Sequence, residues 1–129
     1  MNEKTITNAE LEVMRLLWRE QRAMTLAQIR KELLQTTKWN HSTIKTLVFR
    51  LRDKGVIRPL DKYGAAQFVP LVTESEYIRS EMPTFLDRVF EGNAKKLVAA
   101  LVDNGELSEK DVDELKAYFK IKGGGGSEL

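Results

Sequence analysis

The sequence predicts a mainly α-helical fold with one small β-hairpin, in which three helices and the hairpin precede a second, all-helical part. Three observations lead to this prediction. Capping residues mark five helix starts, apolar residues recur with helical spacing after each start, and two short extended runs flank residues 61–64. We expect domains at 1–72 and 73–122 and a flexible tail at 123–129, because GGGGS there resembles a linker.

The helix starts carry capping boxes. At the first start, the Thr7 hydroxyl can accept a free backbone N–H of the first turn, and the Glu10 carboxylate can accept the N–H of Thr7. Ile6 and Leu11 flank this pair at the positions of a hydrophobic staple. The same pairing recurs at Thr25 and Gln28, at Thr73 and Glu76, and at Ser108 and Asp111, while Asn40 with Thr43 repeats the cap alone.

The first three helices are expected to share one core, because each carries its apolar residues on one face. These residues are Val13, Met14, Leu17 and Trp18, then Leu26, Ile29 and Leu33, then Ile44, Leu47, Val48 and Leu51. Gly55 closes the third helix, and the runs 56–60 and 65–71 then form the hairpin, with Pro59 and Pro70 at strand ends or on an edge. Three helices followed by a hairpin outline a winged helix-turn-helix.

Charge is divided unequally along the chain. Residues 1–72 hold 13 Lys and Arg against 7 Asp and Glu, and residues 73–129 hold 8 against 12. A basic first part suits a polyanionic partner, although a chance imbalance on a solvated surface explains the same numbers. The chain has no cysteine, which excludes disulfides and thiolate catalysis and is compatible with a cytoplasmic location. The sequence shows no secretory signal and no membrane span.

The outward side of the third helix is typical of a recognition helix. Its first turns present short hydroxyl side chains and Lys45, which can reach a guanine, and Arg50 and Arg52 follow where phosphates are expected. The alternative is an ordinary solvated helix face. The predicted DNA-binding residues, including two cations of the hairpin, are Asn40, His41, Ser42, Thr43, Lys45, Thr46, Phe49, Arg50, Arg52, Lys54, Arg58 and Lys62.

Enzyme chemistry and metal binding are not expected. His41 is the only histidine and has no thiol partner for a metal site, and the chain has no glycine-rich phosphate loop. We therefore predict no catalytic residue, no metal and no cofactor. Trp18 and Trp39 are interpreted as core anchors rather than as base-stacking side chains.

The second part carries more apolar surface than three short helices can bury among themselves, which predicts a homodimer. Packing of these helices back onto the first part is the alternative. Within this part, Pro83 predicts a kink or break, and Gly92 ends the helix that contains it. The predicted dimerisation residues are Tyr77, Ile78, Met82, Phe85, Leu86, Val89, Phe90, Leu97, Leu101, Val112, Leu115 and Phe119.

Three segments carry a family resemblance. They are Ile6–Met14 leading to Trp18, then Trp39–Leu47, and Arg50–Gly55. Over residues 5–120 the sequence resembles the repressors of bacterial penicillinase and methicillin-resistance genes, a family that includes a copper-responsive repressor. The resemblance implies an N-terminal winged helix, a C-terminal dimerisation domain, and binding as a dimer to a palindromic promoter operator with TACA and TGTA half-sites.

The resemblance is incomplete at several positions. Lys45 and Thr46 match an Arg-Thr pair, whereas Ser42 and Phe49 stand where Lys and Thr are usual. Without cysteine, the copper-responsive route of derepression is closed. Resemblance to the penicillinase repressors implies derepression by a sensor protease that cuts an Asn-Phe bond in the dimerisation domain. The bond at the matching position here is Ala100–Leu101.

Two other functions remain open at this point. One is a repressor gated by a small molecule, which an apolar cavity with convergent polar groups near the domain junction would favour. The other is a winged helix that binds proteins and no DNA. The salt dependence of DNA binding distinguishes the second from an operator-binding repressor.

Overall fold

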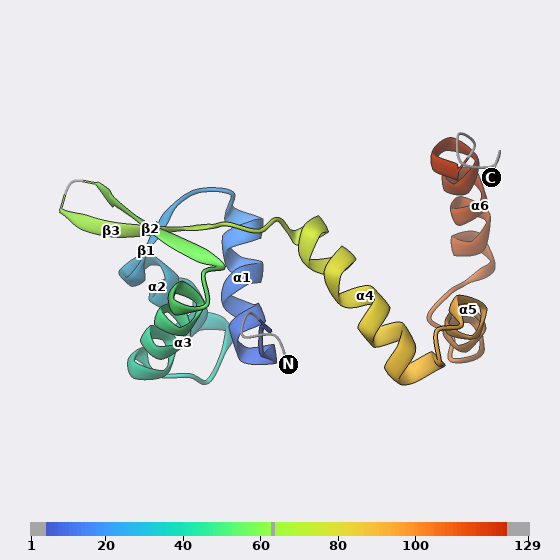
Figure 1. Ribbon diagram of the computed structural model, residues 1–129, viewed down its shortest axis with the longest axis horizontal. Coiled ribbons are helices and arrows are strands. Elements are labelled where there is room, and N and C mark those ends of the chain that lie inside the picture. The colour runs from blue at the N-terminus through green and yellow to red at the C-terminus, as the bar shows by residue number, and fades with distance from the viewer. Residues whose placement is uncertain (1–4, 63, 124–129) are drawn as a thin grey trace. The chain divides into compact units, whose positions relative to one another are not determined.

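The computed structural model describes residues 5–62 and 64–123, and the chain divides into two compact units, Met1–Arg79 and Ser80–Leu129. The elements, in chain order, are α1 (Asn8–Glu20), β1 (Met24–Thr25), α2 (Leu26–Thr36), α3 (His41–Asp53), β2 (Ile57–Lys62), β3 (Ala65–Pro70), α4 (Glu74–Phe90), α5 (Ala94–Asp103) and α6 (Glu109–Gly123) (Figure 1). The two units divide between Arg79 and Ser80, inside α4. The domain boundary expected after residue 72 stays a prediction. Residues 124–129 of the predicted tail lie outside the described part.

All five predicted helix starts have the expected hydrogen bonds. At α1 the Thr7 hydroxyl accepts the Glu10 N–H at 3.1 Å, and the Glu10 carboxylate accepts the Thr7 N–H at 2.9 Å. The pairs at α2, α4 and α6 repeat both bonds, and the Asn40 side chain caps α3. A sixth cap was not predicted: the Asn93 side-chain oxygen accepts the Lys96 N–H at 3.1 Å at the start of α5.

The first unit is a winged helix built on one core. Helices α1, α2 and α3 pack around a three-stranded antiparallel sheet of order β1-β3-β2, from which the β2–β3 hairpin extends (Figure 1). The stripes predicted for the three helices are buried, except that Trp18 and Leu26 are half-buried at the edge of the core. Strand β1 was not predicted, because two residues are too few to show alternation.

The two prolines of the hairpin lie where a missing N–H is tolerated. Pro59 is in the edge strand β2, and Pro70 is the last residue of β3. The hairpin is therefore confirmed, with β2 extending two residues further than the predicted run, to Lys62.

Pro83 does not break α4, which continues through it to Phe90. The prediction of a break was wrong, because one proline removes a single backbone bond while full helical turns on both sides keep theirs. Glu91 and Gly92 then adopt left-handed φ values of 53° and 77°. The N–H of Gly92 donates to the carbonyl of Leu86 at 3.0 Å, so Gly92 ends the helix as expected.

A buried ion pair joins the start of α1 to the end of α3. Only 1% of Glu10 is exposed, and its Oε1 accepts hydrogen bonds from Lys54 Nζ and from the backbone N–H of Thr7. Lys54 also donates to the carbonyl of Thr5 at 2.8 Å. Burial raises the pKa of Glu10, but the hydrogen bonds and charge of Lys54 and the Thr7 N–H outweigh it, so the pKa lies below its ordinary value.

This ion pair corrects the interpretation of Lys54 as a phosphate ligand. Its side chain is 22% exposed and its ammonium is engaged by Glu10 and Thr5, so it does not extend from the outer side of α3. The sequence pattern missed this role because Glu10 is 44 residues away along the chain.

We expect Lys54→Met to lower the free energy of unfolding by about 3 kcal/mol at pH 7, because a buried carboxylate loses its partner. A lowered pKa in the folded state means that the Glu10 contribution is complete above pH 4.5 and is lost as the pH falls below it. Without Lys54 the carboxylate takes up a proton more readily, so the deficit should shrink between pH 7 and pH 4. Urea unfolding across this range measures both effects.

The matched control is Lys31→Met, which removes an exposed lysine of α2 and should change stability by less than about 0.5 kcal/mol. Equal stabilities of the two variants at pH 7 would contradict the structural role of Lys54.

Candidate nucleic-acid interface

Helix α3 has one buried and one exposed side. Ile44, Leu47, Val48 and Leu51 are buried in the core of the first unit. The exposed residues of the helix are His41, Ser42, Lys45, Thr46, Arg50, Arg52 and Asp53, and Thr43 is half-buried between the two sides. The helix thus presents the hydroxyl groups and cations that the sequence predicts for DNA binding, while the DNA contacts themselves stay a prediction.

The N-terminal end of α3 is held by two contacts. The Asn40 side-chain oxygen accepts the Thr43 N–H at 2.8 Å, which caps the helix. From α2, Nε and Nη2 of Arg30 donate to the carbonyl of His41 at 3.3 and 3.2 Å. Asn40, which the sequence predicts to bind DNA, therefore caps α3. The contact of Arg30 with the carbonyl of His41 was not predicted from the sequence.

Phe49 departs from the prediction that it lies outside with the polar residues of α3. It is half-buried and packs against the core of the first unit. The Arg52 guanidinium carbon lies 4.3 Å from the centre of its ring, and Lys45 Nζ lies 5.5 Å from it. These distances fall within the range of cation–π attraction.

The hairpin supplies one described cation. Arg58 lies exposed in β2, opposite Val69 of β3. The backbone of Lys62 pairs with Ala65 at the end of the hairpin, but its side chain lies outside the described part of the chain. Tyr63 also lies outside it.

In the second unit, none of the described residues 80–122 is buried. Along α4, Met82, Phe85 and Val89 are 42, 38 and 46% exposed, and Ile78, at the end of the first unit, is 50% exposed. Leu115 and Phe119 of α6 are also exposed, and the other dimerisation residues predicted for this unit, Leu86, Phe90, Leu97, Leu101 and Val112, are half-buried. The Ala100–Leu101 bond lies within α5.

Tyr77 does not belong with these residues. It lies in the first unit, half-buried against the core, with its ring centre 5.7 Å from that of Trp18. The sequence grouped Tyr77 with the dimerisation residues because all of the nearest ones lie on the same helix, α4. Its position on α4 turns it toward α1 of the first unit.

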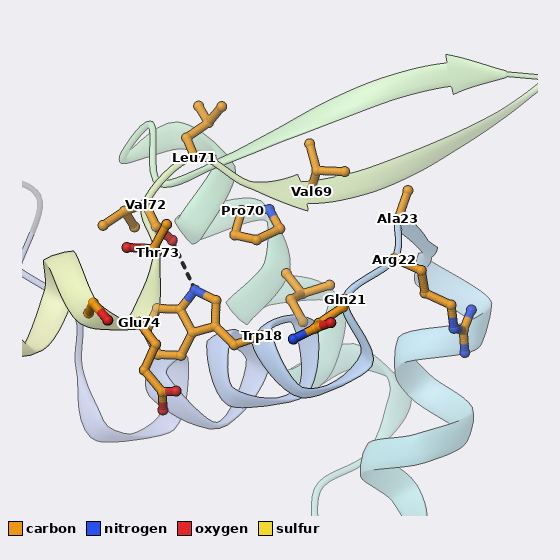
Figure 2. A pocket seen from close by; sticks show the side chains of 12 residues that line it. Trp18, Gln21, Arg22, Ala23, Val69, Pro70, Leu71, Val72, Thr73 and Glu74 are labelled. Atoms are coloured by element: carbon orange, nitrogen blue, oxygen red, sulfur yellow. Dashed lines mark hydrogen bonds between the residues drawn. The ribbon is translucent and has the colours of Figure 1, made fainter.

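Trp18 forms one wall of an open pocket of about 580 Å³ between α1, the end of β3 and the first turn of α4. Figure 2 shows the indole N–H directed at the carbonyl of Val72, to which it donates at 2.9 Å. The polar lining residues are all exposed, and Arg22 is engaged by Glu20 at 3.3 Å. Because no buried polar group points into this pocket, it adds no support to the ligand-gated alternative. The polar lining residues are Gln21, Arg22, Thr73, Glu74 and Ser75.

Two properties of the described residues bear on other functions. No group of histidine and carboxylate side chains in residues 5–62 and 64–123 is suited to hold a metal ion. No helix within the same ranges is long and apolar enough to cross a membrane.

Comparison with known proteins identifies the family. A family model described as Penicillinase repressor matches residues 6–121. The chain belongs to the penicillinase repressor family. It is 33% identical over 110 residues to the penicillinase repressor of Bacillus licheniformis, covering 85% of each chain. It is 32% identical over 124 residues to the methicillin resistance regulatory protein MecI of Mammaliicoccus sciuri, covering 95% of this chain and 100% of that protein.

Solved structures of the repressor BlaI match more than half of the chain. The DNA-binding domain of the repressor BlaI, determined in solution, gives a TM-score of 0.52 at 33% identity over 58% of this chain and 90% of that chain. Monomeric BlaI of Bacillus licheniformis in complex with the blaP half-operator gives 0.51 at 34% identity, over 57% and 89%. The winged-helix fold is thereby confirmed, and the expectation that the chain is no enzyme agrees with a family of repressors.

We expect Asn40→Ala to lower the free energy of unfolding by about 1 kcal/mol, because the first turn of α3 loses its cap. Asn40→Asp retains an acceptor oxygen and adds a charge that the helix N-terminus favours, so it should remain within a few tenths of a kcal/mol of the wild type. Urea unfolding of the three proteins makes the comparison. An alanine variant as stable as the aspartate variant would contradict the capping role.

Proposed function

We propose that this chain is a transcriptional repressor that binds operator DNA as a homodimer, with α3 in the major groove. The observation that carries the proposal is the two-sided α3 of a winged helix, whose exposed side bears Lys45, Arg50 and Arg52. Its relative BlaI was solved in complex with a half-operator, which supports the same task for this unit. A protein with this function acts on DNA in the cytoplasm.

The exposed side of α3 suits a groove that admits a helix. Short Ser42 and Thr46 let the helix approach the bases closely, and a threonine methyl can pack on a thymine methyl. Lys45 can reach the O6 and N7 atoms of a guanine, and Arg50 can neutralise a phosphate. Arg58 on the hairpin is placed to meet the flanking backbone. Lys54 is left out of this interface because Glu10 engages it.

We expect Lys45→Ala to weaken binding to a palindromic duplex with TACA and TGTA half-sites by roughly 1–3 kcal/mol, because a base contact is lost. Lys95→Ala, which removes an exposed lysine of α5 near its N-terminus, is the control and should bind as the wild type does. Fluorescence anisotropy at fixed salt measures both affinities. If Lys45→Ala binds the operator unchanged, Lys45 does not read a base.

The same titration separates a repressor from a module that binds only proteins. Binding to DNA releases counterions, so the logarithm of the affinity should fall linearly with the logarithm of salt concentration, with a slope of about −0.9 for each phosphate contact. A wild-type protein that binds operator and scrambled duplexes equally would refute operator recognition.

Dimerisation is the second part of the proposal, and its support is the exposed apolar surface of α4. On α4, Ile78, Met82, Phe85 and Val89 follow one another at intervals of four, three and four residues. This is the spacing of a helix seam that packs against another helix. Because all four are exposed within one chain, we assign a second copy as the partner that covers them.

We expect Phe85→Asp to shift the protein from dimers to monomers, because the seam would have to bury a charge. Thr84→Asp adds the same charge at the adjacent exposed position outside the seam, and this variant should stay dimeric. Sedimentation velocity at micromolar concentration distinguishes the two states. Dimers of Phe85→Asp would mean that the interface lies elsewhere.

Release from DNA by a sensor protease remains part of the proposal. The bond that matches the cleaved position is Ala100–Leu101, where both residues are half-buried in α5. A protease needs an extended substrate, so α5 must unfold locally before this bond is cut. A chain that stays intact during incubation with a cognate protease would remove this part and leave DNA binding untouched.

A further inference from the structure

Phe49 is the only phenylalanine, tyrosine or tryptophan of α3. The ring is half-buried and packs against the core of the first unit, so protein atoms support it from behind. A side chain held in this way is poorly placed to enter a groove and stack on bases. Its effect on DNA binding must therefore pass through the residues that it contacts.

Two cations of the exposed side contact this ring. Arg52 places its guanidinium carbon 4.3 Å from the ring centre, and Lys45 places Nζ 5.5 Å from it. Lys45 precedes Phe49 by four residues and Arg52 follows it by three, which is the helical spacing that brings side chains together. Arg52 is also engaged by Asp53, through a hydrogen bond of 3.2 Å from Nε.

Free lysine and arginine side chains lose much rotamer freedom when they bind a partner. A contact that already restricts them in the free protein reduces this loss on binding. The face of an aromatic ring can do so for a cation without neutralising its charge.

We propose that Phe49 is a positioning residue for operator recognition, whose ring orients Lys45 and Arg52 on the exposed side of α3 without touching DNA itself. This inference rests on the proposed function. It predicts that Phe49 raises sequence-specific binding more than non-specific binding, because Lys45 is the residue assigned to a base while charge alone governs the non-specific mode.

The test compares Phe49→Leu, which keeps an apolar side chain but removes the ring, with Phe49→Tyr, which keeps a ring. Binding of the full-length variants to the palindromic TACA/TGTA duplex and to a scrambled duplex is measured by anisotropy at one salt concentration. We expect Phe49→Leu to lose about five- to tenfold in operator affinity and less than about twofold on the scrambled duplex. Phe49→Tyr should stay within about twofold of the wild type on both.

A loss of folding would lower both affinities together, so circular dichroism at the assay temperature accompanies each measurement. Lys45→Met is introduced into the wild type and into Phe49→Leu, and the factor by which it reduces operator affinity is compared. A purely structural role of Phe49 would leave this factor the same in both backgrounds. We expect Lys45→Met to reduce operator affinity by a smaller factor in the Phe49→Leu background. Equal factors in the two backgrounds would overturn the proposal.

Failure of this inference and failure of the proposed function would give different binding results. If the wild type prefers the operator and a folded Phe49→Leu variant binds it equally well, Phe49 does not position the cations and the repressor function stands. If the wild type itself does not distinguish the operator from the scrambled duplex, operator recognition fails first.

Discussion

Helix α3 must bury one side in the core and keep the other side free, and most of the first unit serves this constraint. The apolar residues of α3 alone would allow the helix to slide or rotate, because hydrophobic contacts have no direction. Two directed contacts prevent this. Arg30 holds the carbonyl of His41 at the N-terminal end, and Glu10 holds Lys54 at the C-terminal end. An α-helix fixed at both ends presents its exposed side chains at defined positions.

The two directed contacts have different chemistry for a physical reason. Arg30 approaches a carbonyl near solvent, where a neutral acceptor suffices and little desolvation is involved. Glu10 is buried, and a buried charge is tolerated only with a partner. The same ion pair fixes the start of α1 through the capping bond of Glu10 to Thr7. One carboxylate thus couples the N-terminus of α1 to the C-terminus of α3.

Features that depend on neighbours in sequence could be predicted, and features that depend on distant partners could not. The caps at Thr7, Thr25 and Asn40 and the stripe of α3 involve residues within one or two turns, so their pattern is visible in the sequence. Glu10 and Lys54 are far apart in the chain, and a lysine among arginines at a helix end looks like a phosphate ligand until its partner is known. Tyr77 was misassigned for the same reason, since its partner Trp18 lies on another helix.

The contrast between the two units supports the proposal that one chain both reads DNA and forms dimers. The first unit buries its own core, whereas the described part of the second unit buries no residue. A single recognition helix contacts only a few base pairs, so its affinity for one half-site is limited. In the proposed dimer, pairing of two copies makes binding of the second half-site intramolecular, at a high effective concentration. Because that gain would disappear with the pairing, the proposed dimer implies that a change in α4, α5 or α6 releases DNA without altering any residue that touches it.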